Sequence, residues 1–333
     1  MSIEGDRMKR RLLLGGAAAL SLRTAVARSA EPRRIAVMLA VGPSPEYTAS
    51  ITALEQALAA HGWRKGDNLA IDVHWSTGDA QRRREAIAAV LAAAPDVVLV
   101  QSEAVTASVM QAGGRFAVVF VHVADPVGSG LVGGLARPEG RLTGLTNTTP
   151  TLAAKWLQLL RDAAPSVRRV AMLFNPETAA QRGAVFLDPF LVAGRTLGIA
   201  TKAAEVRSPS DIDNSLAALA ASPDGGFVAV PDPFLASNST RIVEQAARLR
   251  LPAVYPYRYY AAQGGLISYG VDNVELFRQS ADYVDRLLRG ATPADLPIQQ
   301  PTRFRMTVNL KAARGLGLEL PLTFVAEADE VIE

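Results

Sequence analysis

Polar side chains follow many of the apolar runs of this sequence, and their types could hold a small solute without covalent chemistry. In chain order they are Ser44, Gln101, Ser102, His122, Asp125, Asn175, Asp232 and Tyr255. A carboxylate could receive a ligand ammonium group, whereas hydroxyls, amides and backbone N–H groups could receive a carboxylate. Serine, aspartate and asparagine also favour helix caps and turns, so each could equally have a purely structural role.

A run of tyrosines adds aromatic surface to this set. Tyr255, Tyr257, Tyr259 and Tyr260 lie beside Arg258, and they could stack on a ligand ring or pack at a hinge. The ligand-binding residues that we predict are Ser44, Tyr47, Gln101, Ser102, Asp125, Asn175, Asp232, Tyr255, Tyr257 and Ser268. We expect Asp125 and Asp232 to face one cleft.

Other kinds of chemistry find little support. The chain has no cysteine, which excludes disulfides and thiol nucleophiles, and its three histidines have no metal-ligand spacing. Residues 128–133 match the GxGxxG pattern, but Pro138 and Gly140 interrupt the helix that a dinucleotide site requires. The G-x-S-x-G pattern of serine hydrolases is absent. We therefore predict neither an enzyme nor a cofactor.

These candidate residues are positioned by alternating strands and helices. Apolar runs predict strands near residues 35–40, 69–74, 96–100, 116–121, 167–174, 200–206, 226–230, 252–255, 264–270 and 304–310. Helices are expected near residues 46–60, 79–94, 151–163, 180–197, 209–221, 238–250, 273–288 and 311–316, with a further one beginning after Gln101-Ser102. This spacing predicts βαβ units and parallel sheets, in which ligands bind beyond the carboxyl ends of the strands.

The alternation is interrupted once, at residues 116–147. A buried strand there gives way to Asp125-Pro126 and a glycine-rich stretch, and a second short strand follows at residues 142–146. We interpret this stretch as the end of one α/β lobe and the first crossing into another.

The first 30 residues predict an export signal. Lys9-Arg10-Arg11 precede the apolar run Leu12–Leu22, and Ala25-Val26-Ala27 offers a cleavage site near Ala27. The paired arginines resemble a twin-arginine signal, with an ordinary secretory signal as the alternative. Residues 1–27 carry five of the 35 basic and two of the 32 acidic residues, so the remainder is charge-balanced. That balance argues against nucleic acid as a partner, and we expect a periplasmic protein.

Several longer stretches carry a family resemblance. They are ADPVGSGLVGGLARPEGRLTGLTN at 124–147, RVAMLFNPE at 169–177, RLRLPAVYPYRYYAAQGGLISYGVD at 248–272, residues 283–321 and the C-terminal ADEVIE. The sequence resembles the ABC-transporter substrate-binding family typified by periplasmic proteins that bind tryptophan and other aromatic amino acids.

The resemblance implies a two-lobed type I periplasmic-binding fold with three hinge crossings, which we expect near residues 145, 265 and 300. One lobe would comprise residues 31–145 and 266–299, and the other residues 146–265 and 300–333. The implied function is that of a monomer that captures a small solute, such as an amino acid or a related carboxylate or amide. It would deliver that solute to an ABC permease in the inner membrane. A ligand-sensing subunit that presents its ligand to a receptor is the alternative.

One departure from the family concerns the turn after the third strand. Relatives have small residues there, whereas this chain has Gln101-Ser102-Glu103. A long amide and a carboxylate at the cleft would change the size and polarity of the pocket. The identity of the solute therefore does not follow from the resemblance.

Overall fold

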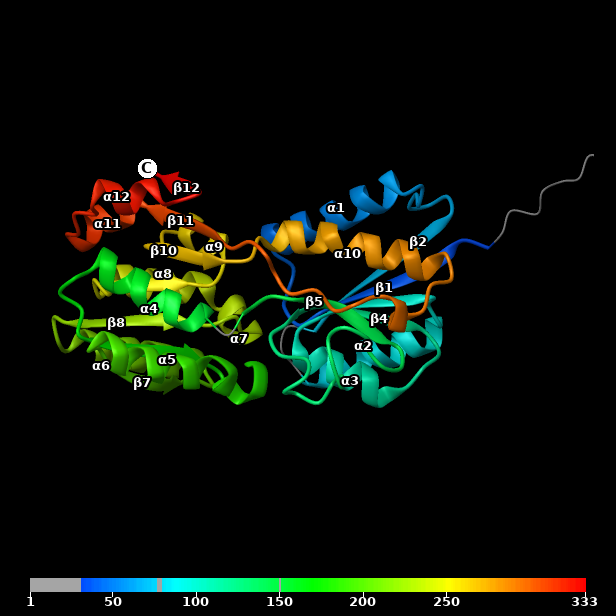
Figure 1. The fold of residues 1–333 in the computed structure, drawn as a ribbon, viewed down its shortest axis with the longest axis horizontal. Helices are drawn as coiled ribbons and strands as arrows, with labels where there is room; N and C mark the ends of the chain where they lie inside the picture. Colours follow the sequence, from blue (N-terminus) through cyan, green and yellow to red (C-terminus); the bar gives the residue numbers. More distant parts are fainter. Residues whose placement is uncertain (1–30, 77–79, 150) are drawn as a thin grey trace, which may run out of the picture. The chain divides into compact units, whose positions relative to one another are not determined.

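The computed structural model describes residues 31–76, 80–149 and 151–333. The predicted export signal and Asp79, the expected cap of the second helix, lie outside these residues. The described chain contains two β-sheets, each with helices packed against it (Figure 1). None of the helices within the described part is long and apolar enough to cross a bilayer.

The first sheet has five parallel strands in the order β2-β1-β3-β4-β5. They are β1 (Arg33–Leu39), β2 (Leu69–Trp75), β3 (Val97–Gln101), β4 (Ala117–Val123) and β5 (Leu142–Thr146). The helices that connect them are α1 (Pro45–Ala60), α2 (Ala80–Ala93) and α3 (Glu103–Ala112). Every residue of β3 and β5 is buried, as expected for strands covered on both faces. We call this sheet and its helices the first lobe.

The second sheet has seven strands in the order β12-β11-β10-β9-β8-β6-β7. They are β6 (Arg169–Phe174), β7 (Ala200–Glu205), β8 (Gly225–Ala229), β9 (Ala253–Tyr255), β10 (Ile267–Gly270), β11 (Arg305–Asn309) and β12 (Glu330–Ile332). All neighbours are parallel except β10 and β11, which pair antiparallel. We call this sheet and its helices the second lobe.

The helices of the second lobe follow the same βαβ plan. They are α4 (Leu152–Ala163), α5 (Ala184–Leu197), α6 (Pro209–Ala220), α7 (Pro233–Ser237), α8 (Ser239–Arg248), α9 (Arg258–Ala262), α11 (Leu310–Leu316) and α12 (Leu322–Ala326), with a 3₁₀ turn η1 (Ala180–Gly183) before α5. The expected single helix over 180–197 is therefore divided. Gln181 and Arg182 have left-handed backbones, with φ of 47° and 58°, and a regular helix cannot pass through them.

The chain crosses between the sheets three times, and the second crossing differs from expectation. Strand β10 pairs with β9 and β11 of the second sheet, so the chain leaves that sheet after Gly270 rather than near residue 265. A strand that continues the ladder of β9 satisfies its backbone groups before the chain leaves. Helix α10 (Asn273–Leu288) then lies beside α1 on the first sheet (Figure 1).

The third crossing follows a short 3₁₀ turn, η2 (Pro293–Asp295). Gln299 still bridges to Leu145 at the edge of the first sheet, and β11 resumes the second sheet at Arg305. Apart from the position of β10, the lobe boundaries proposed above remain a prediction.

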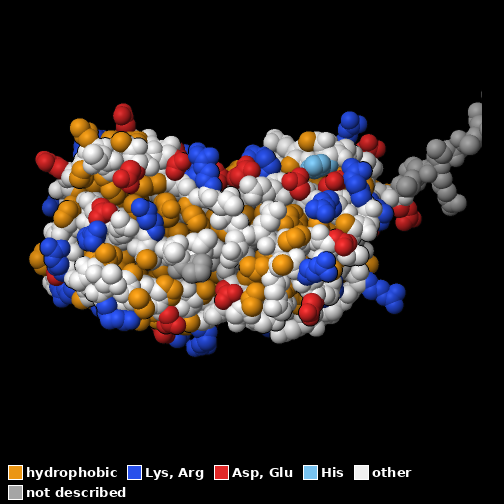
Figure 2. All heavy atoms as spheres, in the orientation of Figure 1, with side chains coloured by type: hydrophobic (Ala, Val, Ile, Leu, Met, Phe, Trp, Pro, Cys, Tyr) orange, Lys and Arg blue, Asp and Glu red, His pale blue; other side chains and the backbone are white. Residues whose placement is uncertain are grey.

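Charged side chains of both signs are scattered over the face shown in Figure 2. That face has no continuous basic stripe within the described residues.

Candidate functional site

Residues from both lobes enclose a small cavity, which we call the interlobe cavity. It is lined by Tyr47, Gln101, Ser102, His122, Asn147, Pro231, Asp232, Pro233, Ala236 and Tyr257. Its volume of about 20 Å³ has room for roughly one water molecule. Sites for small organic ligands measure about 300–1,000 Å³. A solute can therefore enter only if the two lobes separate.

Gln101 joins three strand ends on the first-lobe side of the cavity. Its Oε1 accepts the backbone N–H of Ala40, 2.9 Å away, at the end of β1. Its Nε2 therefore faces Nδ1 of His122 on β4, at 3.4 Å. Gln101 is 4 % exposed, so its long side chain is buried and held by these hydrogen bonds rather than free to move in solvent.

His122 is presented by an irregularity at the end of β4. Its φ is 58°, and the register between β4 and β5 shifts between Val121 and Val123. Burial lowers the pKa of His122 to about 4, and a smaller effect of Asn273 opposes that shift. The imidazole is therefore neutral near pH 7, with Nδ1 accepting from Gln101 and the proton on Nε2. Nε2 is buried and makes no hydrogen bond of normal geometry within the described residues, although the Asn273 side chain lies close enough to affect the pKa of the ring.

Asp232 holds together two strand ends of the second lobe. Its carboxylate accepts the backbone N–H of Asn175 at 2.7 Å and the hydroxyl of Thr178 at 2.7 Å. It also caps α7 by accepting the N–H groups of Phe234 and Leu235, at 2.7 and 3.3 Å. Burial raises the pKa of Asp232 to about 6, although these hydrogen bonds act in the opposite direction. Four internal donors occupy the carboxylate, as expected for a structural anchor.

Asn147 lies at the first crossing and reaches the second lobe. Its Nδ2 donates to the hydroxyl of Tyr257 at 3.1 Å. Its Oδ1 is buried and has no hydrogen-bond partner in the described part of the chain. The cavity wall thus includes two residues, His122 and Asn147, that each carry one unpaired buried polar atom. Such atoms are unusual in folded proteins and often mark functional sites.

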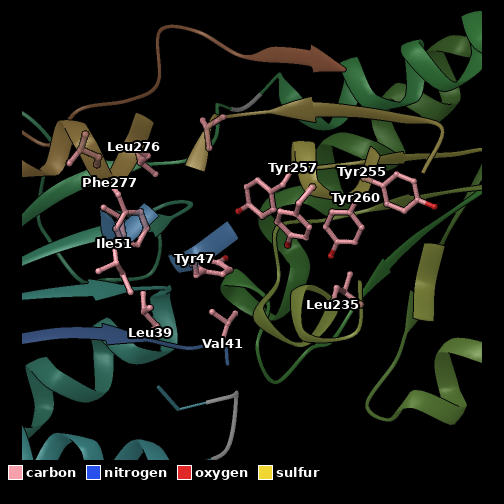
Figure 3. Close-up of a cluster of buried hydrophobic side chains, with 14 of the residues drawn as sticks. Leu39, Val41, Tyr47, Ile51, Leu235, Tyr255, Tyr257, Tyr260, Leu276 and Phe277 are labelled. Atoms are coloured by element: carbon pink, nitrogen blue, oxygen red, sulfur yellow. The ribbon is translucent and has the colours of Figure 1, made fainter. Parts of the chain in front are cut away.

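The tyrosines form a stacked series rather than a set of free ligand platforms. Tyr257 stacks on Tyr259, with centroids 5.8 Å apart; Tyr259 stacks on Tyr260 at 4.6 Å, and Tyr260 on Tyr255 at 5.0 Å. The first-lobe ring of His122 lies 5.6 Å from Tyr257. Figure 3 shows Tyr47 between these rings and the first-lobe residues Leu39 and Ile51. Of the four clustered tyrosines, Tyr257 alone lines the interlobe cavity.

The ten predicted binding residues thus divide into three groups. Those that line the interlobe cavity are Tyr47, Gln101, Ser102, Asp232 and Tyr257. Asp125 lines a neighbouring cavity of about 390 Å³. Those that line neither cavity are Ser44, Asn175, Tyr255 and Ser268.

Capping and strand packing explain most of the third group. Ser44 caps α1 by accepting the N–H of Tyr47, and Oδ1 of Asn175 accepts the N–H of Glu177 within a turn. Ser268 is buried in β10 beside Tyr255. A structural role for these residues was the alternative left open by the sequence.

Asp125 and Asp232 line different cavities in this structure, and that they face one cleft stays a prediction. The Asp232 carboxylate is drawn inward by its four donors, whereas Asp125 accepts the N–H of Gly128 at 2.8 Å. The other Asp125 oxygen accepts from Nε2 of Gln181 in the second lobe, at 3.0 Å. The Gln181 backbone N–H also donates to Oε1 of Glu103, at 3.1 Å. We call Gln181, Glu103 and Asp125 the interlobe clasp.

Sequence reasoning missed Asn147 and Gln181. Asn147 follows β5 where the chain leaves the first lobe, and a polar residue after an apolar strand was an available signal. No sequence signal pointed to Gln181. A left-handed backbone is usually marked by a glycine, and this position has a glutamine instead.

Metal chemistry receives no support from the side chains in view. Across residues 31–76, 80–149 and 151–333, no group of three histidine, aspartate or glutamate side chains could hold a metal ion. The site therefore offers hydrogen bonds, aromatic surface and lobe closure, which suit reversible binding.

Comparison with known proteins agrees with this geometry. Residues 34–332 match the model of the ABC transporter substrate binding protein family. The chain belongs to this family. A tyrosine-binding protein of Clostridioides difficile (strain R20291) is 20 % identical to this substrate-binding protein over 266 residues, 79 % of this chain and 75 % of the relative.

Two solved structures share the fold of this substrate-binding protein. A Streptococcus pneumonia ABC domain in complex with L-Trp has a TM-score of 0.83 at 22 % identity, covering 91 % of this chain and 100 % of that one. A conserved domain protein of Vibrio cholerae has a TM-score of 0.83 at 24 % identity, covering 90 % and 100 %. The expected type I periplasmic-binding fold is confirmed. Proteins of this family bind small molecules in the context of ABC transporters and are not enzymes.

Proposed function

We propose that this substrate-binding protein is the exported solute receptor of an ABC uptake transporter. It binds a small solute between its lobes. That solute is an amino acid, aromatic amino acids included, or a related small carboxylate or amide. The protein acts as a monomer and delivers that solute to a permease in the inner membrane. Its leader, with paired arginines before an apolar run, supports export to the periplasm.

The observation that carries this proposal is the composition of the interlobe cavity. Side chains from the strand ends of both lobes meet there, and His122 and Asn147 each have an unpaired buried polar atom. A solute that enters when the lobes separate would meet a neutral imidazole, two amides and two tyrosine rings. On closure it would contact both lobes, so binding and closure would be coupled. The names of two relatives, which report tyrosine and tryptophan, support an aromatic amino acid as the first solute to test.

A thermal-shift screen of the chain from Arg28 onward tests this proposal. The panel contains aromatic amino acids, their amides, other amino acids, aromatic acids and small sugars. A solute at 100 times its Kd stabilises the protein by about 2.7 kcal/mol, which raises Tm by several degrees. Isothermal titration then gives the affinity of each hit.

Matched asparagine variants locate the site. Asn147→Ala should weaken binding of the hit at least tenfold, because Asn147 lines the cavity and orients Tyr257. Asn214→Ala, at an exposed position of α6, should leave the affinity unchanged. Absence of any thermal shift, together with absence of a co-purifying small molecule in native mass spectrometry, would count against the proposal.

A further inference from the structure

The turn that carries Gln181 has an unusual backbone. Gln181, Arg182 and Gly183 are three consecutive left-handed residues, with φ of 47°, 58° and 91°. The first two are not glycine, so this conformation is energetically unfavourable and must be held by its surroundings. A methyl group on Gly183 would lie 2.5 Å from the ring of Phe174, so the turn is packed tightly against the end of β6.

The only described partners of the Gln181 side-chain amide and backbone N–H lie in the first lobe. The N–H donates to Glu103, the first residue of α3, and the amide donates to Asp125, which follows β4. One strained residue therefore contacts two carboxylates of the opposite lobe. Because the acceptors are carboxylates, these hydrogen bonds are stronger than neutral ones.

The first lobe is shaped to receive this amide. Oδ1 of Asp125 is fixed by the N–H of Gly128, which leaves Oδ2 for Gln181. A methyl group on Gly128 would lie 2.1 Å from Oδ2 of Asp125 and 2.7 Å from Nε2 of Gln181. The close approach of the three residues therefore requires glycine at this position.

We propose that Gln181 is a closure-determining residue, which sets the affinity for solute by holding the lobes together without lining the interlobe cavity. Gln181 and Asp125 both line the neighbouring 390 Å³ cavity, whereas neither lines the interlobe cavity. The inference rests on the proposed function for its effect on affinity, but the closing of the unliganded protein can be measured without any solute.

The expected effect follows from population shift. Contacts made only in the closed state raise the ratio of closed to open molecules. Gln181→Ala removes the side-chain hydrogen bond to Asp125 and keeps the backbone N–H that donates to Glu103, and loss of that one bond to a carboxylate lowers the ratio by roughly tenfold. A solute that is held only by closed molecules then dissociates faster, because the lobes reopen more often. We expect a roughly tenfold weaker Kd for Gln181→Ala, expressed in the dissociation rate.

Spin-label distances between the lobes test the proposal directly. The chain contains no cysteine, so Ala92→Cys on α2 and Val192→Cys on α5, both exposed, give two labels at chosen places. In the unliganded parent the distance distribution should contain a short, closed component. Gln181→Ala and Gly128→Ala should each move most of that component to longer distances. Gln263→Ala, an exposed glutamine outside the clasp, is the matched control and should leave the distribution unchanged.

The outcomes separate this proposal from the proposed function. A parent with only the long distance, or variants with the parental distribution, would overturn the role of Gln181 while leaving the solute screen intact. If the spin-label distances change as expected but the solute screen finds no ligand, only the solute proposal is overturned. Circular dichroism and urea midpoints show whether each variant is folded, and a midpoint shift without a change in distance would assign Gln181 to stability instead of closure.

Discussion

The interlobe cavity and the interlobe clasp are each formed by residues of both lobes, but their side chains differ in chemistry. The cavity is lined mainly by aromatic and amide groups, and His122 and Asn147 there keep unpaired buried atoms. The clasp consists of one glutamine and two carboxylates, joined by hydrogen bonds of 3.1 and 3.0 Å. Under the two proposals above, the cavity recognises a solute and the clasp governs closure.

The acidic residues of the two regions differ in the same way. Asp232 is 4 % exposed and fully engaged by its own lobe, whereas Asp125 reaches across to the other lobe. Burial and the nearby Asp125 raise the pKa of Glu103, while the N–H of Gln181 lowers it. The carboxylate nearest to the cavity thus supports the fold, and those of the clasp connect the lobes.

Replacing each aspartate in turn should give the largest difference in stability between the two regions. Asp232→Ala leaves buried N–H and hydroxyl groups without an acceptor, so the free energy of unfolding should fall by about 3 kcal/mol or more. Asp125→Ala should lower it by only about 1 kcal/mol, because water can replace the carboxylate at its more exposed position. Urea unfolding measures both values. Equal losses would contradict the distinction between anchor and clasp.

The pH dependence of stability separates two buried groups of the cavity. The pKa of His122 is lowered to about 4, so unfolded chains bind its proton more readily and stability should rise between about pH 4 and 6.5. The pKa of Asp232 is raised to about 6, so folded chains bind its proton more readily and stability should fall between about pH 3.8 and 6. Each effect amounts to about 3 kcal/mol at most.

The two effects oppose each other, so His122 and Asp232 together should contribute little net pH dependence in the shared range. His122→Gln should become less stable from pH 4 to 6, and Asp232→Asn more stable, whatever the absolute stability of each variant. Urea unfolding at half-unit steps of pH gives the slopes. Slopes of the same sign in both variants would show that these residues do not titrate as described.

Glycine substitutions sharpen the comparison at the turn that carries the clasp. Gly183→Ala combines a left-handed φ of 91° with a methyl group 2.5 Å from Phe174, so it should lower the free energy of unfolding by about 2 kcal/mol. Gly62→Ala has a similar φ of 94° but no atom within 4 Å of the added methyl group, and about 1 kcal/mol is expected. Identical losses would mean that the turn is loosely packed.

The smallest effect concerns the hydroxyl of Tyr257. Tyr257→Phe removes the acceptor for the buried Asn147 amide and should lower the free energy of unfolding by about 1 kcal/mol. Tyr269→Phe removes a half-buried hydroxyl outside the cavity and should change it by less than about 0.5 kcal/mol. Denaturant unfolding distinguishes the two. A neutral Tyr257→Phe would indicate that Asn147 finds another partner.

The sequence by itself determined the alternation of strands and helices and the polar residues at the strand ends. These features follow from local periodicity, capping preferences and the parallel βαβ connection, all of which act over a few residues. The candidates Gln101, Ser102 and Asp232 were found in this way, since residues after parallel strands converge on one edge.

Tertiary structure alone decided which of those residues meet across the lobes. Asp232 is turned inward because Thr178 and three backbone N–H groups satisfy it, and Asp125 faces another cavity because Gly128 and Gln181 hold it there. The left-handed backbone of Gln181 has no local signature, because contacts with the other lobe stabilise it. Long-range hydrogen bonds therefore assigned roles that residue type and spacing left open.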